Sequence, residues 1–125
     1  MKRPLILTYA GCDTCRKALQ WLKARGVEAE VRPIVEAPPT RAELARWIPA
    51  SGLPVRKWLN TSGMSYRALG KAKVDAASDP TVEGWLAADG KLVKRPVLVV
   101  GDEVRVGFKA PEWEALFPGR ASEQT

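Results

Sequence analysis

Two cysteines three residues apart, placed between a short apolar run and an amphipathic stretch, constrain the fold more than any other feature. The apolar run covers residues 5–9 and is closed by Gly11, a pattern that predicts a buried β-strand. Cys12 and Cys15 follow at once, where the strand gives way to a helix. We therefore expect a strand–turn–helix unit with both sulfurs close to its turn.

A helix is expected over residues 14–25, because apolar side chains recur there at the spacing of one helical face. These side chains are Cys15, Ala18, Leu19 and Leu22. Gly26 stands where a left-handed helix cap is wanted, and residues 29–32 have the length of a second strand. The first third of the chain thus predicts a strand–helix–strand unit with two parallel strands.

The middle of the chain, about residues 40–90, predicts a helical insertion. A first helix is expected after Thr40, which can act as N-cap and form a capping box with Glu43. Pro49 is expected to end that helix, because proline lacks the backbone donor. Another helix is expected to start at Asp79 as its N-cap. Between the two, residues 53–59 predict a short helix.

The last third returns to strands. Residues 96–100 and 104–106 are rich in valine and predict two strands joined by a tight turn. A final helix is expected over 111–117, and residues 119–125 form a frayed tail. We expect a single domain over residues 1–118 with an α/β fold. Its thioredoxin-like mixed β-sheet is flanked by helices, and the helical insertion interrupts it.

Composition and charge exclude several classes of protein. Apolar residues make up 46% and charged residues 27% of the 125 residues, as in globular proteins. No apolar run approaches the ~20 residues of a membrane span, and the apolar run Leu5-Ile6-Leu7 after the basic start is too short for the core of a signal peptide. We therefore expect a cytoplasmic protein. Histidine is absent, which excludes Ser-His-Asp and Cys-His catalysis.

Positive charge is concentrated near the start of the chain. The first 25 residues carry +5 of the net charge of +6, with Asp13 as their one acidic side chain. Such a segment suits an anionic partner, for example a small oxyanion or an anionic thiol. A solvated basic face explains the charge as well. The two cysteines lie inside this same segment, which favours the functional interpretation.

The spacing of Cys12 and Cys15 at a helix start is typical of a thiol–disulfide motif. Helix N-termini carry partial positive charge, and Arg16 and Lys17 add to it, so the pKa of Cys12 is expected below that of a free thiol. Cys15 lies one turn on, on the apolar face, and is expected to be less exposed. We predict that Cys12 attacks and Cys15 resolves. Two ordinary reduced cysteines, or half a zinc site, are the alternatives, although zinc would need two further ligands.

Three groups of residues resemble the arsenate reductase and Spx/MgsR family, and their order along the chain is that of the family. They are Tyr9-Ala10-Gly11-Cys12-Asp13-Thr14-Cys15-Arg16-Lys17-Ala18, then Arg56 to Gly63 with Tyr66 and Leu69, then Asp89-Gly90, Leu92 to Pro96 and Val106-Gly107-Phe108. The resemblance implies a cytoplasmic protein with a thioredoxin-like fold and a helical insertion. The family contains both arsenate reductases and redox-sensing transcription regulators.

The resemblance assigns roles to single residues. Cys12 matches the family's nucleophile, and Arg95 matches the arginine that binds arsenate or faces the reactive sulfur. A planar guanidinium suits a tetrahedral oxyanion. The family also implies a cis peptide between Arg95 and Pro96. Asn60 takes the place of a family arginine, so the candidate substrate-binding residues are Arg16, Asn60 and Arg95.

The resemblance implies two functions. The favoured one is a thiol-dependent oxidoreductase, an arsenate reductase with Cys12, Cys15 and Arg95 as catalytic residues. It would need no metal or organic cofactor, and its external reductant would be thioredoxin or glutathione with glutaredoxin. The alternative is a redox-sensing regulator that binds RNA polymerase, with a Cys12–Cys15 disulfide as its sensor. Neither function involves a membrane or direct binding of nucleic acid.

Overall fold

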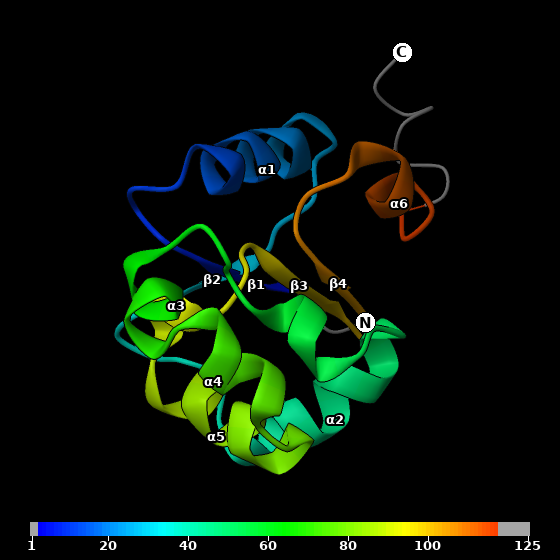
Figure 1. The fold of residues 1–125 in the computed structure, drawn as a ribbon. Helices are drawn as coiled ribbons and strands as arrows, with labels where there is room; N and C mark the ends of the chain where they lie inside the picture. Colours follow the sequence, from blue (N-terminus) through cyan, green and yellow to red (C-terminus); the bar gives the residue numbers. More distant parts are fainter. Residues whose placement is uncertain (1–2, 118–125) are drawn as a thin grey trace. The chain divides into compact units, whose positions relative to one another are not determined.

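A computed structural model describes residues 3–117 of the chain. Its contacts divide the chain into two compact units, one formed by Met1–Arg32 with Arg95–Thr125 and the other by Pro33–Lys94. The first unit contains the β-sheet, and the second corresponds to the predicted helical insertion, which is slightly longer than expected (Figure 1). One domain over residues 1–118 stays a prediction, and the predicted frayed tail lies outside the described residues.

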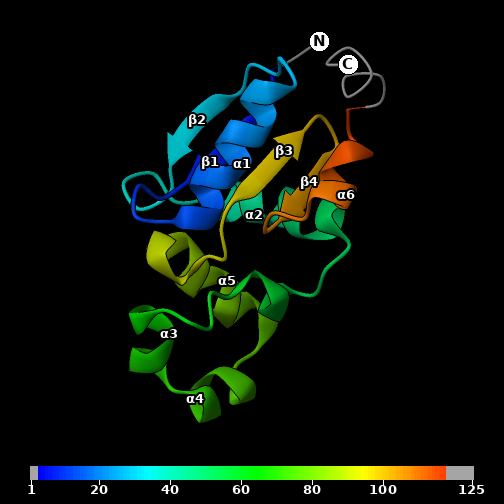
Figure 2. The ribbon, with the colours of Figure 1, turned by 90° about the horizontal axis from the view of Figure 1, so that it is seen from above.

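The sheet of the first unit has four strands in the order β2-β1-β3-β4. Their bounds are Leu5–Thr8 (β1), Glu30–Pro33 (β2), Val97–Val100 (β3) and Glu103–Val106 (β4). β3 pairs antiparallel with both β1 and β4, whereas β1 and β2 run in the same direction (Figure 2). The predicted parallel pair and the mixed, thioredoxin-like sheet are therefore confirmed.

Helices α1 (Asp13–Ala24) and α6 (Ala110–Glu114) cover the same face of this sheet (Figures 1 and 2). They enclose a core formed by Ile6, Ala18, Leu22, Val27, Leu98 and Trp113. Ile6 and Leu98 are paired across β1 and β3, so both strands contribute to the same layer. Trp21 and Phe108 pack edge-to-face with Trp113. This core holds α1 against the sheet.

Helix α1 ends as its sequence predicts. Gly26 adopts a left-handed backbone with φ of 69°, which costs glycine little. Its N–H donates to the Lys23 carbonyl at 3.0 Å, and the Val27 N–H donates to the Leu22 carbonyl at 3.0 Å. These two bonds form a Schellman motif, closed by the burial of Leu22 and Val27 in one core.

The second unit consists of short helices. They are α2 (Arg41–Ser51), η1 (Val55–Trp58), α3 (Met64–Leu69), α4 (Lys71–Ala76), α5 (Asp79–Ala88) and η2 (Gly90–Leu92). Sequence patterning did not predict α3 and α4. α3 has no buried residue, α4 buries only Val74, and neither has a side-chain cap, so both lack the stripe and the cap by which a helix is recognised.

Two predicted helix boundaries of this unit are wrong, and in the first unit α6 ends at Glu114 rather than at residue 117. α2 continues through Pro49 and ends at Ser51, and its C-cap Gly52 is left-handed with φ of 73°. A proline so close to the C-terminus costs one helical bond, and the Gly52 N–H still closes the turn on the Pro49 carbonyl at 3.1 Å. At the start of α5 the N-cap is Ser78 rather than Asp79. The capping box of Thr40 and Glu43 is confirmed.

Arg56 ties the helices of the second unit together. Its guanidinium donates to Asp79 Oδ1 at 3.0 Å, to the Val74 carbonyl at 3.1 Å and to the Ala77 carbonyl. This explains why Asp79 does not cap α5, since its carboxylate faces the arginine. The basic side chain of Arg56 is thus an internal brace of this unit.

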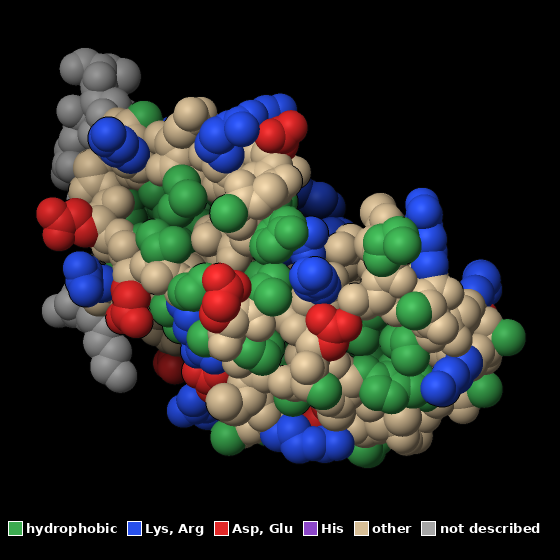
Figure 3. Space-filling model, turned by 90° about the vertical axis from the view of Figure 1, so that its left-hand side faces the viewer, with side chains coloured by type: hydrophobic (Ala, Val, Ile, Leu, Met, Phe, Trp, Pro, Cys, Tyr) green, Lys and Arg blue, Asp and Glu red, His purple; other side chains and the backbone are tan. Residues whose placement is uncertain are grey.

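On the face drawn in Figure 3, Lys and Arg side chains are dispersed, with Asp and Glu among them. Within residues 3–117, no helix is both long and apolar enough to cross a membrane.

Candidate active site

Cys12 is the N-cap residue of α1, and its backbone is extended, with φ of −102° and ψ of 113°. Its Sγ accepts a hydrogen bond from the Cys15 N–H at 3.2 Å, in the place of the usual serine or aspartate oxygen. Its own N–H donates to the Tyr9 carbonyl at 3.1 Å. Cys12 is therefore hydrogen-bonded through its sulfur to the first turn of α1 and through its backbone N–H to Tyr9, which follows β1.

The pKa of the Cys12 thiol is lowered. Partial burial by itself raises this pKa, but several contacts outweigh it. The Cys15 thiol and the Cys15 backbone N–H donate hydrogen bonds to Cys12, and Arg95 adds its positive charge and a hydrogen bond. All of these favour the thiolate. The predicted nucleophile thus has the electrostatic surroundings of a reactive cysteine.

Cys15 has the opposite character. Its side chain is 1% exposed, and burial together with its hydrogen bond to Cys12 raises the pKa of its thiol to about 12. A backbone hydrogen bond with Tyr9 and the charge of Arg95 act in the other direction but do not prevail. Both cysteines are free thiols in the structure. The predicted difference in exposure between Cys12 and Cys15 is confirmed.

Arg95 stands two residues before β3, where it hydrogen-bonds to Cys12 and its charge acts on both thiols. The Arg95–Pro96 peptide bond is cis, as the family resemblance implies. The guanidinium lies over the ring of Tyr9, with its carbon 4.6 Å from the ring centroid. Because β3 is the neighbour of β1, this residue returns to the loop that carries Cys12. The structure therefore brings together three of the predicted residues: Cys12, Cys15 and Arg95.

Arg16 points to a different partner. Its guanidinium forms an ion pair with Asp13 Oδ1 at 2.8 Å, and both side chains are largely exposed. Asp13 also lies in the first turn of α1, where a negative charge is favourable. This pair offsets the negative charge that lies between the two cysteines. Binding of substrate by Arg16 stays a prediction.

Asn60 belongs to the second unit, not to the unit that contains the thiols. Its amide nitrogen donates to the Lys91 carbonyl at 3.3 Å, and its backbone N–H donates to the Leu92 carbonyl at 2.8 Å. These bonds fasten the turn at residues 60–63 to η2. Its predicted contact with substrate stays a prediction.

Tyr9 is a site residue that patterning did not single out as functional. Its ring contacts Arg95 and its carbonyl accepts from Cys12. The signal in the sequence is its place just before the cysteines, at the start of the segment that resembles the family. Among residues 3–117, no group of three or more His, Cys, Asp or Glu is arranged to hold a metal ion.

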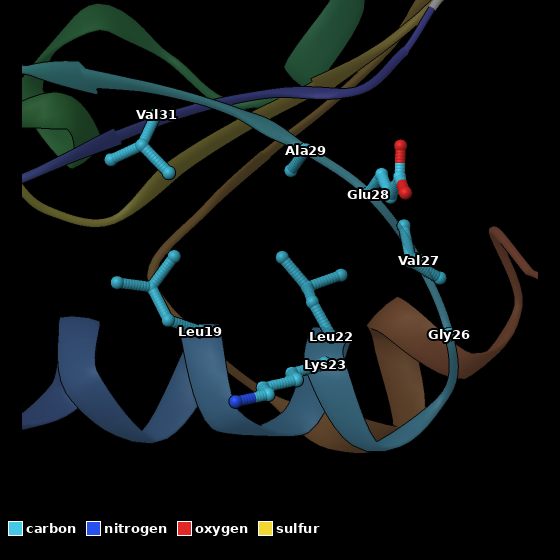
Figure 4. A pocket seen from close by; sticks show the side chains of 8 residues that line it. All are labelled: Leu19, Leu22, Lys23, Gly26, Val27, Glu28, Ala29 and Val31. Atoms are coloured by element: carbon cyan, nitrogen blue, oxygen red, sulfur yellow. The ribbon is translucent and has the colours of Figure 1, made fainter.

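A pocket of about 310 Å³ opens elsewhere in the first unit, between α1 and β2 (Figure 4). Leu19 and Leu22 point into it from the helix, and Ala29 and Val31 point into it from the strand side. Its lining contains no cysteine and no arginine. The reactive groups of the molecule therefore lie outside this pocket.

Comparison with family models identifies the family of the chain. The model of the ArsC family matches residues 7–116, a range that includes both cysteines and Arg95. The chain belongs to the ArsC family.

Known ArsC-family relatives carry different descriptions. YusI of Bacillus subtilis (strain 168) is 44% identical over 107 residues, which cover 85% of this chain and 91% of that protein. The regulatory protein MgsR of the same organism is 28% identical, over 84% of this chain and 82% of its own length. An arsenate reductase of Escherichia coli (strain K12) is 32% identical, over 70% of this chain and 62% of the enzyme.

A solved structure supports the ArsC fold. The crystal structure of an ArsC family related protein from Bacteroides fragilis matches with a TM-score of 0.87 and 46% sequence identity. The match covers 92% of this chain and 99% of that chain. The sheet, the flanking helices and the insertion therefore match those of this ArsC family related protein.

Proposed function

We propose that this ArsC-family protein is a cytoplasmic thiol-dependent oxidoreductase that reduces arsenate to arsenite. The observation that carries the proposal is the Cys12 thiol, which lies at a helix N-terminus with its pKa lowered and Arg95 beside it. Such a thiolate reacts with an electrophilic substrate, and Arg95 beside it favours a substrate that carries negative charge. An arsenate oxyanion meets both requirements, and the arsenate reductases among the relatives support the choice.

In the first step the Cys12 thiolate attacks the arsenic atom of arsenate. A sulfur–arsenic bond forms, and an arsenate oxygen leaves as hydroxide and is protonated to water. The guanidinium of Arg95 stabilises the negative charge that collects on the remaining oxygens, because its planar N–H groups match two of them. Arsenic is still pentavalent at this stage.

The second step transfers two electrons. A thiolate, from Cys15 or from glutathione, attacks the Cys12 sulfur, so that a disulfide forms and the sulfur–arsenic bond breaks. The electron pair of that bond stays on arsenic, which leaves as trivalent arsenite. Thioredoxin, or glutathione with glutaredoxin, then reduces the disulfide by exchange.

Cys15 is suited to act only after Cys12 has reacted. Its hydrogen bond to Cys12 and the charge of the Cys12 thiolate both raise the pKa of Cys15. Burial is the largest cause of this raised pKa, so Cys15 does not compete with Cys12 for the first attack, while the charge of Arg95 favours ionisation of Cys15.

The proposal is tested by arsenate-dependent oxidation of NADPH, with the thioredoxin and the glutaredoxin systems supplied in turn. We expect turnover with at least one system and none with Cys12→Ser. Arg46→Ala, which removes an exposed arginine of α2 in the other unit, is the control variant, and we expect it to retain turnover. Absence of arsenate-dependent turnover with both systems overturns the proposal.

The similarity to the regulatory protein MgsR favours a second candidate function, that of a regulator, which on this proposal senses redox state and binds RNA polymerase. Here the disulfide between Cys12 and Cys15 would be the sensor and no oxyanion would be consumed. Capture of RNA polymerase that depends on the oxidation state of the two thiols, without arsenate turnover, would favour the regulator. Capture that Cys12→Ser and Cys15→Ser leave unchanged would exclude it.

A further inference from the structure

Tyr9 touches the reactive loop at two places. Its ring lies under the guanidinium of Arg95, 4.6 Å from ring centroid to guanidinium carbon. Its carbonyl accepts the N–H of Cys12 at 3.1 Å. One residue at the end of β1 therefore contacts both the cation and the backbone of the nucleophile.

Gly11 leaves the space that the Tyr9 ring occupies. A Cβ atom at position 11 would lie 3.0 Å from Cε2 of the ring, closer than ordinary van der Waals contact. Gly11 is not among the glycines with a left-handed backbone, so room for the ring, rather than φ, explains the glycine. The ring packs against the loop between β1 and Cys12 and cannot shift freely toward it.

The guanidinium of Arg95 needs such a support. An arginine side chain has several rotatable bonds, and an aromatic face attracts a guanidinium and restricts its plane. Arg95 is also the cation that acts on both thiols. Where the guanidinium lies therefore governs how strongly it stabilises the Cys12 thiolate.

We propose that Tyr9 is a positioning residue whose ring holds the Arg95 guanidinium toward Cys12, with Gly11 providing the room for that ring. Through Arg95 it acts on the thiolate. The consequence for arsenate turnover rests on the proposed function, whereas the consequence for the Cys12 thiol does not.

The test measures the pKa of Cys12 from the pH dependence of iodoacetamide labelling, followed by peptide mapping. Tyr9→Leu keeps an apolar side chain but removes the aromatic face, and we expect the pKa of Cys12 to rise by roughly half a unit to one unit. Tyr9→Phe keeps the ring and is expected to leave the pKa near the wild-type value. Tyr66→Leu, which changes a tyrosine of the other unit, is the matched control.

A double-mutant cycle distinguishes positioning from a general loosening of the loop. If Tyr9 acts through the guanidinium, Tyr9→Leu has no further effect on the pKa of Cys12 once Arg95→Ala is present. Gly11→Ala, which presses on the ring, is expected to shift the pKa in the same direction as Tyr9→Leu. Equal pKa shifts from Tyr9→Leu in the presence and absence of Arg95, or a Tyr9→Phe variant as impaired as Tyr9→Leu, would overturn the proposal.

These measurements also separate the two proposals. If the protein does not turn over arsenate, the labelling of Cys12 still tests Tyr9. If it does, we expect Tyr9→Leu to slow turnover and Tyr9→Phe to retain it.

Discussion

At the scale of single residues, the two cysteines differ far more than two thiols in one short motif suggest. Cys12 is half-buried with a lowered pKa, while Cys15 is buried with its pKa raised to about 12. The difference comes from surroundings, since one sulfur accepts hydrogen bonds at the helix start and the other is enclosed by the core.

The first prediction concerns the titration of these thiols. Because the pKa of Cys12 is lowered from that of an ordinary thiol, more of Cys12 is thiolate at neutral pH, and its alkylation there should be faster than that of an ordinary thiol. Cys15 should stay unreactive until strongly alkaline pH, since its pKa is about 12. Labelling with iodoacetamide against pH, with peptide mapping, measures both. Faster alkylation of Cys15 at neutral pH would reverse the two roles.

The second prediction concerns Arg95. Arg95→Ala should lower oxyanion turnover on the order of a hundredfold, because a charge-assisted contact of about 2–4 kcal/mol is lost at the transition state. The pKa of Cys12 should rise in the same variant, because Arg95 is one of its lowering causes. Arg95→Lys should recover only part, since an ammonium lacks the planar fork. Unchanged kcat/KM and thiol pKa in Arg95→Ala would leave Arg95 a surface residue without a role in the reaction.

At the scale of elements, both thiols lie at the start of α1, Cys12 as the N-cap and Cys15 in the first turn. The third prediction tests the two sulfurs separately by substitution. Cys12→Ser should abolish turnover, because a serine hydroxyl is un-ionised at neutral pH. Cys15→Ser should preserve the first attack, so an adduct should accumulate on Cys12 unless glutathione and glutaredoxin resolve it. Intact-mass spectrometry detects the adduct in Cys15→Ser. In the wild type, mild oxidation should instead lower the mass by two hydrogens, as a Cys12–Cys15 disulfide forms.

The outcomes distinguish two forms of the mechanism. Total inactivation by both substitutions would favour an internal disulfide reduced by thioredoxin. Full activity of Cys15→Ser with glutaredoxin would favour the single-cysteine form. Activity retained in Cys12→Ser would exclude thiol catalysis altogether.

The glycines at the ends of helices in the second unit provide the fourth prediction. A Cβ on Gly90, at the start of η2, would lie 1.9 Å from the Ile34 carbonyl oxygen, a backbone atom that cannot move aside. Gly90→Ala should therefore lower the free energy of unfolding by about 3 kcal/mol or more. Gly52→Ala, at the left-handed end of α2, meets no atom within 4 Å and should cost only about 1–2 kcal/mol. Urea denaturation compares them, and equal losses would contradict the close approach.

At the scale of the whole molecule, the chain leaves the sheet after β2, builds a helical unit and returns to the sheet at Arg95. This return is what brings Arg95 to Cys12, because β3 pairs with β1 directly. The reactive loop thus depends on two segments far apart in the sequence that one sheet joins. Cys12, Cys15 and Arg95 all belong to the first unit, whereas Asn60 belongs to the second.

The sequence by itself determined the features that neighbouring residues control. The cysteine motif at a helix start, the capping box of Thr40 and Glu43 and the left-handed Gly26 all follow from contacts within a turn or two, and so they could be predicted from local patterns. The parallel pair of the first two strands followed from the strand–helix–strand order.

Only the tertiary structure decided which partner each polar group takes. Asp79 faces Arg56 instead of capping α5, Asn60 bonds to Lys91, and the Tyr9 ring lies under Arg95. A local pattern shows which bonds a side chain is able to form, but the choice among them depends on groups that packing brings near from other parts of the chain. For the same reason the unequal pKa values of Cys12 and Cys15 depend on burial and on Arg95, and neither is a property of the motif alone.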